Sequence, residues 1–117
     1  MKKFLIILLS FVLSAAAVNS HATAAPGTAT TTIMVFGDSL SAGYGLPQDA
    51  GWVSLLKRRL QTQSQAYLIN NSVSGETAHG GRKRIEQALK TYRPDIVIVE
   101  LGGTDGLRGA SIETIRN

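Results

Sequence analysis

The stretch Ile33-Met34-Val35-Phe36-Gly37-Asp38-Ser39-Leu40 decides the fold. Its first four residues form an unbroken apolar run, which is typical of a strand buried on both faces of a parallel sheet. Gly37 ends this run and a polar pair follows it. Because a serine between a strand and a helix is often the helix N-cap, one interpretation of Ser39 is a cap. The other interpretation is a nucleophile at the carboxyl edge of the sheet.

Downstream of this strand, helical and extended patterns alternate. Apolar residues recur at helical spacing in residues 51–62 and 81–92, and short extended runs occupy residues 67–69 and 95–101. The helical apolar positions are Trp52, Val53, Leu56 and Leu60 in the first segment and Ile85, Ala88, Leu89 and Tyr92 in the second. The order strand, helix, strand, helix, strand predicts an α/β fold with a parallel sheet.

Three loops follow the predicted strands, at residues 37–47, 70–81 and 102–109, and all three are rich in Gly, Ser, Thr, Asp or Asn. In open parallel sheets, binding groups gather beyond the carboxyl ends of the strands. We therefore expect Ser74-Gly75-Glu76-Thr77 and Gly102-Gly103-Thr104-Asp105-Gly106 to lie at the same rim as Ser39. This shared position favours the interpretation of Ser39 as a nucleophile.

Residues 1–24 have the features of a secretory signal peptide. Lys2 and Lys3 precede an apolar stretch over residues 4–18, and Ala22-Thr23-Ala24 supplies the small residues of a cleavage site. A buried helix or a short membrane anchor is the alternative, but the apolar stretch is shorter than a spanning helix requires. We therefore expect an exported protein without a membrane span after cleavage. Residues 25–32 are expected to be a leader, and residues 33–117 to be folded.

Composition excludes several classes of function. The chain has 117 residues, a net charge of +4 and no Cys, which rules out disulfides, thiolate zinc sites and a cysteine nucleophile. The basic clusters Lys57-Arg58-Arg59 and Arg82-Lys83-Arg84 both lie in helical patterns with an apolar opposite side. A solvated helix face explains both clusters, so we expect no nucleic-acid partner. His79 is the one histidine after residue 24, which leaves no pattern for a metal site.

Together, the three loop motifs resemble those of the SGNH, or GDSL, serine hydrolases. Gly37-Asp38-Ser39-Leu40 matches the first block, Gly75 the second, and Gly102, Gly103 and Asp105 the third. Residues 101–109 are similar to one branch, the exported bacterial arylesterases and multifunctional acyl-CoA thioesterase and lysophospholipase enzymes. The resemblance implies a flavodoxin-like three-layer fold, no metal or cofactor, a small acyl-ester or thioester substrate, and a periplasmic or secreted location.

The resemblance also implies roles for individual residues. Ser39 would be the nucleophile that forms an acyl-enzyme, and the backbone N–H groups of Ser39 and Gly75 would donate to the oxyanion. Asp38 would orient the loop. Thr104 stands where the family has an Asn whose amide is the third oxyanion donor. Since losing one such donor typically slows an enzyme about a hundred- to a thousandfold, Thr104 could weaken activity without abolishing it.

The family's final block, an Asp and a His three residues apart, does not occur in this chain. Glu76 and His79 have the same spacing, but they belong to the second block, so a surface histidine near a helix start is the favoured interpretation. Ser111 can cap a last helix containing Ile112 and Ile115, which has fewer than two turns before residue 117. We therefore expect residues 33–117 to be the N-terminal portion of a longer hydrolase domain. The alternative is a non-catalytic module without a complete triad.

Overall fold

The computed structural model describes residues 30–116. Within this range the elements are β1 (Thr31–Gly37), α1 (Ser39–Ala42), α2 (Trp52–Gln63), β2 (Ala66–Asn70), α3 (Ala78–Tyr92), β3 (Ile96–Glu100), α4 (Gly103–Leu107) and α5 (Ile112–Arg116). The strands are parallel and ordered β2-β1-β3, with β1 in the centre. The predicted α/β fold with a parallel sheet is confirmed.

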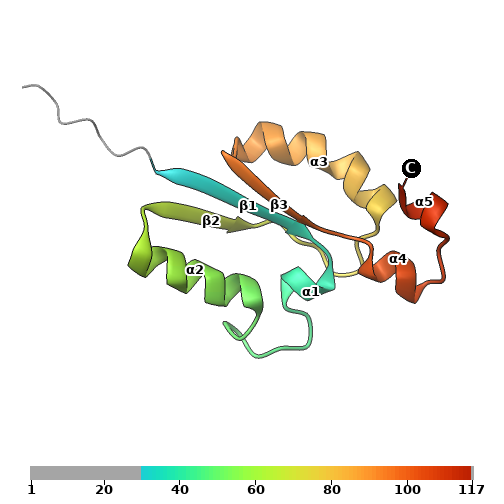
Figure 1. Cartoon of the computed structure of the whole chain (residues 1–117), viewed down its shortest axis with the longest axis horizontal. Helices are drawn as coiled ribbons and strands as arrows, with labels where there is room; N and C mark the ends of the chain where they lie inside the picture. The colour runs from blue at the N-terminus through green and yellow to red at the C-terminus, as the bar shows by residue number, and fades with distance from the viewer. Residues whose placement is uncertain (1–29, 117) are drawn as a thin grey trace, which may run out of the picture.

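The central strand β1 is buried on both faces, as its apolar run predicts. Met34, Val35 and Phe36 have no exposed surface. Because side chains alternate along a strand, Met34 and Phe36 pack with Ala88 of α3, whereas Val35 packs on the other face with Val53 of α2. Helices α2 and α3 therefore cover opposite faces of the sheet, in three layers (Figure 1).

The N-terminal boundary of the sheet differs slightly from the expectation. The expected signal peptide and residues 25–29 of the leader lie outside the described residues. The last two leader residues, Thr31 and Thr32, belong to β1. Strand pairing and Asp95 extend β1 to this point, since the Thr32 amide donates to the Asp95 carboxylate at 2.7 Å and the Asp95 amide donates to the Thr32 carbonyl at 2.8 Å.

Local capping explains where several helices begin. Helix α3 starts at Ala78, three residues before the predicted start, because the Thr77 hydroxyl accepts a hydrogen bond from the Gly80 amide at 3.0 Å. Ser111 caps α5 as predicted, and its Oγ accepts from the Thr114 amide at 3.2 Å. The short helices α1 and α4 were not predicted, because four or five residues are too few to show apolar periodicity.

Apolar side chains remain exposed along β3 and the adjacent flank of α3. They are Leu89, Tyr92, Ile96 and Val99, with 40 to 56% of their surface exposed. Within residues 30–116, no helix combines the length and apolar character needed to cross a bilayer. The polar loops instead gather at the carboxyl end of the sheet, where α1, α4 and α5 lie together (Figure 1).

Candidate active site

Ser39 is the first residue of α1, and Asp38 alone separates it from the end of β1. Asp38 is the N-cap of this helix, because its Oδ1 accepts a hydrogen bond from the Leu40 amide at 2.9 Å. The interpretation of Ser39 as a helix cap is therefore wrong. Ser39 is half-buried, and its hydroxyl has no hydrogen-bond partner among the described residues. The Ser39 hydroxyl is thus available at the rim of the sheet.

The Asp38 carboxylate joins the first loop to the third. Only 1% of Asp38 is exposed, and its Oδ2 lies 3.3 Å from the Thr104 amide and 3.5 Å from the Thr104 hydroxyl. A Cβ on Gly103 would come within 3.0 Å of this oxygen, so a glycine permits the close approach. Asp38 therefore receives backbone N–H groups from the first turns of both α1 and α4.

Two polar residues at the ends of the outer strands hold α1 in place. The Ser41 hydroxyl donates to Glu100 Oε2 at 2.8 Å, and the Asn70 side-chain Nδ2 donates to the Ser41 carbonyl at 2.8 Å. A Cβ on Gly37 would come within 2.7 Å of Ser41 Oγ, so only glycine fits beneath the helix. The roles of Ser41, Asn70 and Glu100 were not predicted from the sequence. For Asn70 and Glu100 a signal was present, because they are polar residues at the ends of β2 and β3.

The second loop places Gly75 in a tight turn. The Glu76 amide donates to the Val73 carbonyl at 3.1 Å, and Gly75 has a φ of +82°, a conformation that glycine adopts without strain. The Val73 amide donates to the Gly37 carbonyl at 3.0 Å, which holds this loop beside the end of β1. In the described part of the chain, neither the Ser39 N–H nor the Gly75 N–H has an acceptor. Two free donors therefore lie on adjoining loops.

The third loop is tied to the second by a buried acid. Asp105 is 5% exposed, and its Oδ2 accepts a hydrogen bond from the Ala78 amide at 2.8 Å. Thr104 is also buried, and its hydroxyl is directed toward Asp38. The three loops that sequence analysis assigned to one rim are therefore joined by hydrogen bonds, as expected.

The pair Glu76 and His79 does not act as a unit in this arrangement. Glu76 Oε2 forms an ion pair with Arg84 Nε at 2.8 Å, and Glu76 Oε1 accepts from the Thr77 amide at 3.2 Å. His79 is exposed in the first turn of α3, and its imidazole has no hydrogen-bond partner within residues 30–116. The interpretation of His79 as a surface residue near a helix start is confirmed.

The solvated-face interpretation holds for the first basic cluster and fails for part of the second. Residues 57–59 are exposed on α2, as are residues 82 and 83 on α3. Arg84 instead turns inward and lies 4.0 Å from the centroid of the Phe36 ring. Its Nε and Nη1 have carboxylate and amide partners and its guanidinium carbon lies over an aromatic ring, whereas its Nη2 is buried without a hydrogen-bond partner among the described residues.

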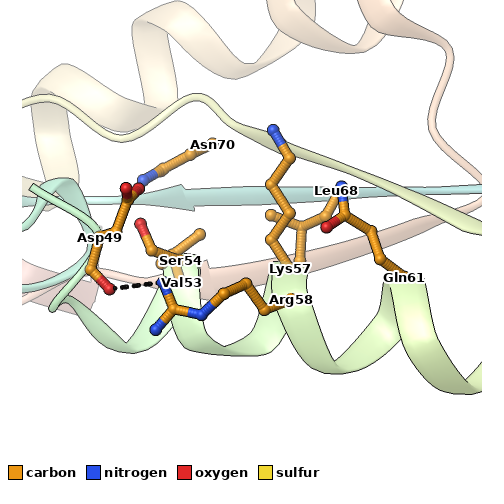
Figure 2. A pocket seen from close by; sticks show the side chains of 8 residues that line it. All are labelled: Asp49, Val53, Ser54, Lys57, Arg58, Gln61, Leu68 and Asn70. Carbon is orange, nitrogen blue, oxygen red and sulfur yellow. Dashed lines mark hydrogen bonds between the residues drawn. The ribbon is translucent and has the colours of Figure 1, made fainter.

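A pocket of about 330 Å³ lies between α2 and the edge strand β2 (Figure 2). Lys57, Arg58 and Asn70 are among its lining residues, whereas Ser39, Gly75 and Thr104 are not. Arg58 extends along its wall and donates to the Asp49 carbonyl at 3.0 Å. Ser39 and Gly75 therefore do not line this pocket, although Asn70, which bonds Ser41 of α1, does.

Comparison with known proteins agrees with the geometry of the rim. Residues 35–117 match the GDSL-like lipase/acylhydrolase family. The chain is 46% identical over 82 residues to the esterase TesA of Pseudomonas aeruginosa, with 69% of this chain and 41% of TesA covered. It is 44% identical over 81 residues to thioesterase 1/protease 1/lysophospholipase L1 of Escherichia coli, with 69% of this chain and 38% of that protein covered. The chain therefore spans less than half the length of these relatives.

Solved structures show the same fold. A crystal structure of TesA aligns with a TM-score of 0.70 at 41% identity, covering 74% of this chain and 48% of that one. A psychrotrophic esterase EstA from Pseudoalteromonas, solved with monoethylphosphonate as inhibitor, aligns with a TM-score of 0.68 at 46% identity over the same shares. These neighbours and the family match agree with the loop motifs, and the chain belongs to the GDSL, or SGNH, hydrolase family.

Proposed function

We propose that this chain is the N-terminal part of an exported serine hydrolase that cleaves small acyl esters or thioesters through Ser39. One observation carries the proposal: after the central strand stands a serine hydroxyl, and on adjoining loops lie two backbone N–H groups, none of which has a hydrogen-bond partner within residues 30–116. The relatives named esterase and thioesterase support the substrate class.

In the proposed reaction, Ser39 Oγ attacks the acyl carbonyl carbon and transfers its proton to a general base. The carbonyl oxygen becomes an oxyanion, which the N–H groups of Ser39 and Gly75 stabilise. Collapse of this intermediate expels the protonated alcohol or thiol and leaves an acyl-enzyme. Water then attacks the acyl group by the same route and releases the acid and free Ser39.

The general base is proposed to lie outside this chain. A serine hydroxyl is a weak nucleophile until an adjacent base accepts its proton, and His79, the histidine of the second block, is exposed and without a partner in the described range. The match covers 41% of TesA, and this partial coverage supports the proposal that an Asp and a His lie beyond Asn117. Export rests on residues 1–24, which have the sequence features of a signal peptide.

A fluorophosphonate probe tests the assignment of Ser39 directly. A phosphonate forms a covalent bond with an activated serine, and the related Pseudoalteromonas esterase was solved with a phosphonate inhibitor. We expect the probe to label the whole enzyme once, on the peptide that contains Ser39, as read by mass spectrometry. Labelling on another serine, or none, would contradict the proposal. Absence of labelling would favour the non-catalytic alternative.

The substitution Thr104→Asn is expected to raise kcat by at least about tenfold, because it restores a donor whose loss typically costs about a hundred- to a thousandfold. The Thr104 hydroxyl lies 3.5 Å from Asp38 Oδ2, so it is directed at that carboxylate. Steady-state hydrolysis of a p-nitrophenyl ester measures the change. The matched control is Thr104→Val, which removes the hydroxyl and keeps the branched shape of the side chain. An unchanged or lower kcat for Thr104→Asn would show that position 104 is not a weakened donor.

A further inference from the structure

Arg84 lies between the sheet and the loop that carries Gly75. Its side chain is 28% exposed, and its guanidinium carbon lies 4.0 Å from the centroid of the Phe36 ring in the buried face of β1. The contact with the Phe36 ring restrains the orientation of the guanidinium on the side that faces the sheet. The group is therefore a rigid fork at the base of the second loop.

The fork contacts both ends of that loop. Nε donates to Glu76 Oε2 at 2.8 Å, and Nη1 donates to the Asn71 carbonyl at 3.0 Å and to Asn71 Oδ1 at 3.2 Å. Asn71 directly follows β2, and Glu76 directly follows Gly75. One side chain thus joins the entry and the exit of the segment that holds the Gly75 turn.

The turn itself is exposed at residues 73–75. Within residues 30–116, the Glu76 amide closes it by donating to the Val73 carbonyl, and the Val73 amide ties its start to the Gly37 carbonyl. Glu76 reaches Arg84 across the first turn of α3, where a Cβ on Gly80 would overlap Glu76 Oε1. A glycine at position 80 therefore leaves room for the ion pair. The direction of the Gly75 N–H depends on how firmly these flanking residues are held.

We propose that Arg84 is a positioning residue for the Gly75 donor. It holds Asn71 and Glu76 at a fixed separation, and this separation sets the orientation of the Gly75 N–H toward the oxyanion. The inference rests on the proposed esterase function. An oxyanion exists only in the transition state and the tetrahedral intermediate, so a misplaced donor lowers kcat and leaves ground-state binding nearly unchanged.

The first test is Arg84→Lys in the whole enzyme, which keeps the positive charge and loses the fork. With a p-nitrophenyl ester, we expect kcat to fall by about ten- to a hundredfold, a smaller loss than removal of an entire donor would cause. KM is expected to stay within about twofold, since ground-state binding does not use the oxyanion donors. Arg59→Lys is the matched control, because Arg59 is exposed on α2 and bonds Gln63 on the same helix. It is expected to leave kcat and KM unchanged.

A second measurement separates positioning from simple stabilisation of the fold. If Arg84 acts through Gly75, Arg84→Lys should cost much less in kcat when Gly75→Ala is already present. Glu76→Gln weakens one anchor of the fork and should lower kcat in the same direction, which provides a test if Arg84→Lys does not fold. Equal losses with and without Gly75→Ala, or a fall in thermal stability without a fall in kcat, would overturn the role of Arg84.

The two hypotheses fail in different ways. Failure of the proposed function would appear as wild-type enzyme without Ser39-dependent ester hydrolysis or fluorophosphonate labelling. Failure of the Arg84 inference alone would appear as normal Ser39-dependent hydrolysis in both wild type and Arg84→Lys. A rise in KM at constant kcat would also overturn the inference, because it would indicate a role in substrate binding.

Discussion

Replacing Ser39 with Ala is expected to lower kcat for ester hydrolysis by about 10⁴- to 10⁶-fold in the whole enzyme, as loss of the nucleophile does in other serine hydrolases. The reason is that alanine lacks the side-chain oxygen that would form the acyl-enzyme. The fold should be unaffected, because Asp38, and not Ser39, caps α1. Steady-state kinetics with a p-nitrophenyl ester and a thermal unfolding curve measure the two effects.

Ser64→Ala is the control for this substitution. Ser64 is exposed at the C-terminal end of α2, where its hydroxyl donates to the Leu60 carbonyl at 3.1 Å. The same chemical change is expected to leave kcat unchanged there. If Ser39→Ala retained more than about a hundredth of wild-type kcat, Ser39 would not be the nucleophile, because the oxyanion donors alone give far less residual catalysis.

The substitution Gly75→Ala is expected to lower kcat by about a hundred- to a thousandfold with little change in KM. Gly75 has a φ of +82°, and an L-residue in the left-handed region costs about 1 to 2 kcal/mol. The turn can relieve this strain by rotating the peptide, which would direct the N–H away from the oxyanion. Kinetics with the same ester, together with the rate of fluorophosphonate labelling, measure the loss of the donor.

Gly109→Ala separates backbone strain from loss of the donor. Gly109 has a φ of +71° and open space around its Cα, so the added methyl group imposes a similar strain. Its N–H already donates to the Gly106 carbonyl at 3.0 Å, unlike the free N–H of Gly75. We expect Gly109→Ala to lower the unfolding temperature with little effect on kcat. Equal kcat losses in the two variants would show that strain alone is responsible.

The elements of the fold could be predicted from local sequence patterns. The run over residues 33–36 indicates a doubly buried strand, and apolar spacing indicates both long helices, because burial imposes these periodicities directly. The predicted positions of the helix ends were less accurate. Thr77 caps the start of α3 through a hydrogen bond that apolar spacing does not reveal. The short helix α1, capped by Asp38, was not predicted because four residues are too few to show apolar periodicity.

Arg84 shows where a local pattern misleads. By sequence it belongs to a run of three basic residues that a solvated helix face explains, yet it stacks on Phe36 and binds Glu76 and Asn71. Helical spacing places a residue on a face, but long side chains at the border between faces can turn either way. Only the partners that the fold brings near decide the direction.

The sequence by itself determined the parallel α/β class, the family, and Ser39, Gly75 and Thr104 as candidate site residues. These follow from local periodicity and from motifs of a few adjacent residues. Only the tertiary structure decided what holds those residues in place. Asp38 is hydrogen-bonded to Thr104, 66 positions further along the chain, and Ser41 is hydrogen-bonded to Glu100, 59 positions further along. Such contacts depend on the order and register of the strands, because parallel pairing brings distant segments to one edge of the sheet.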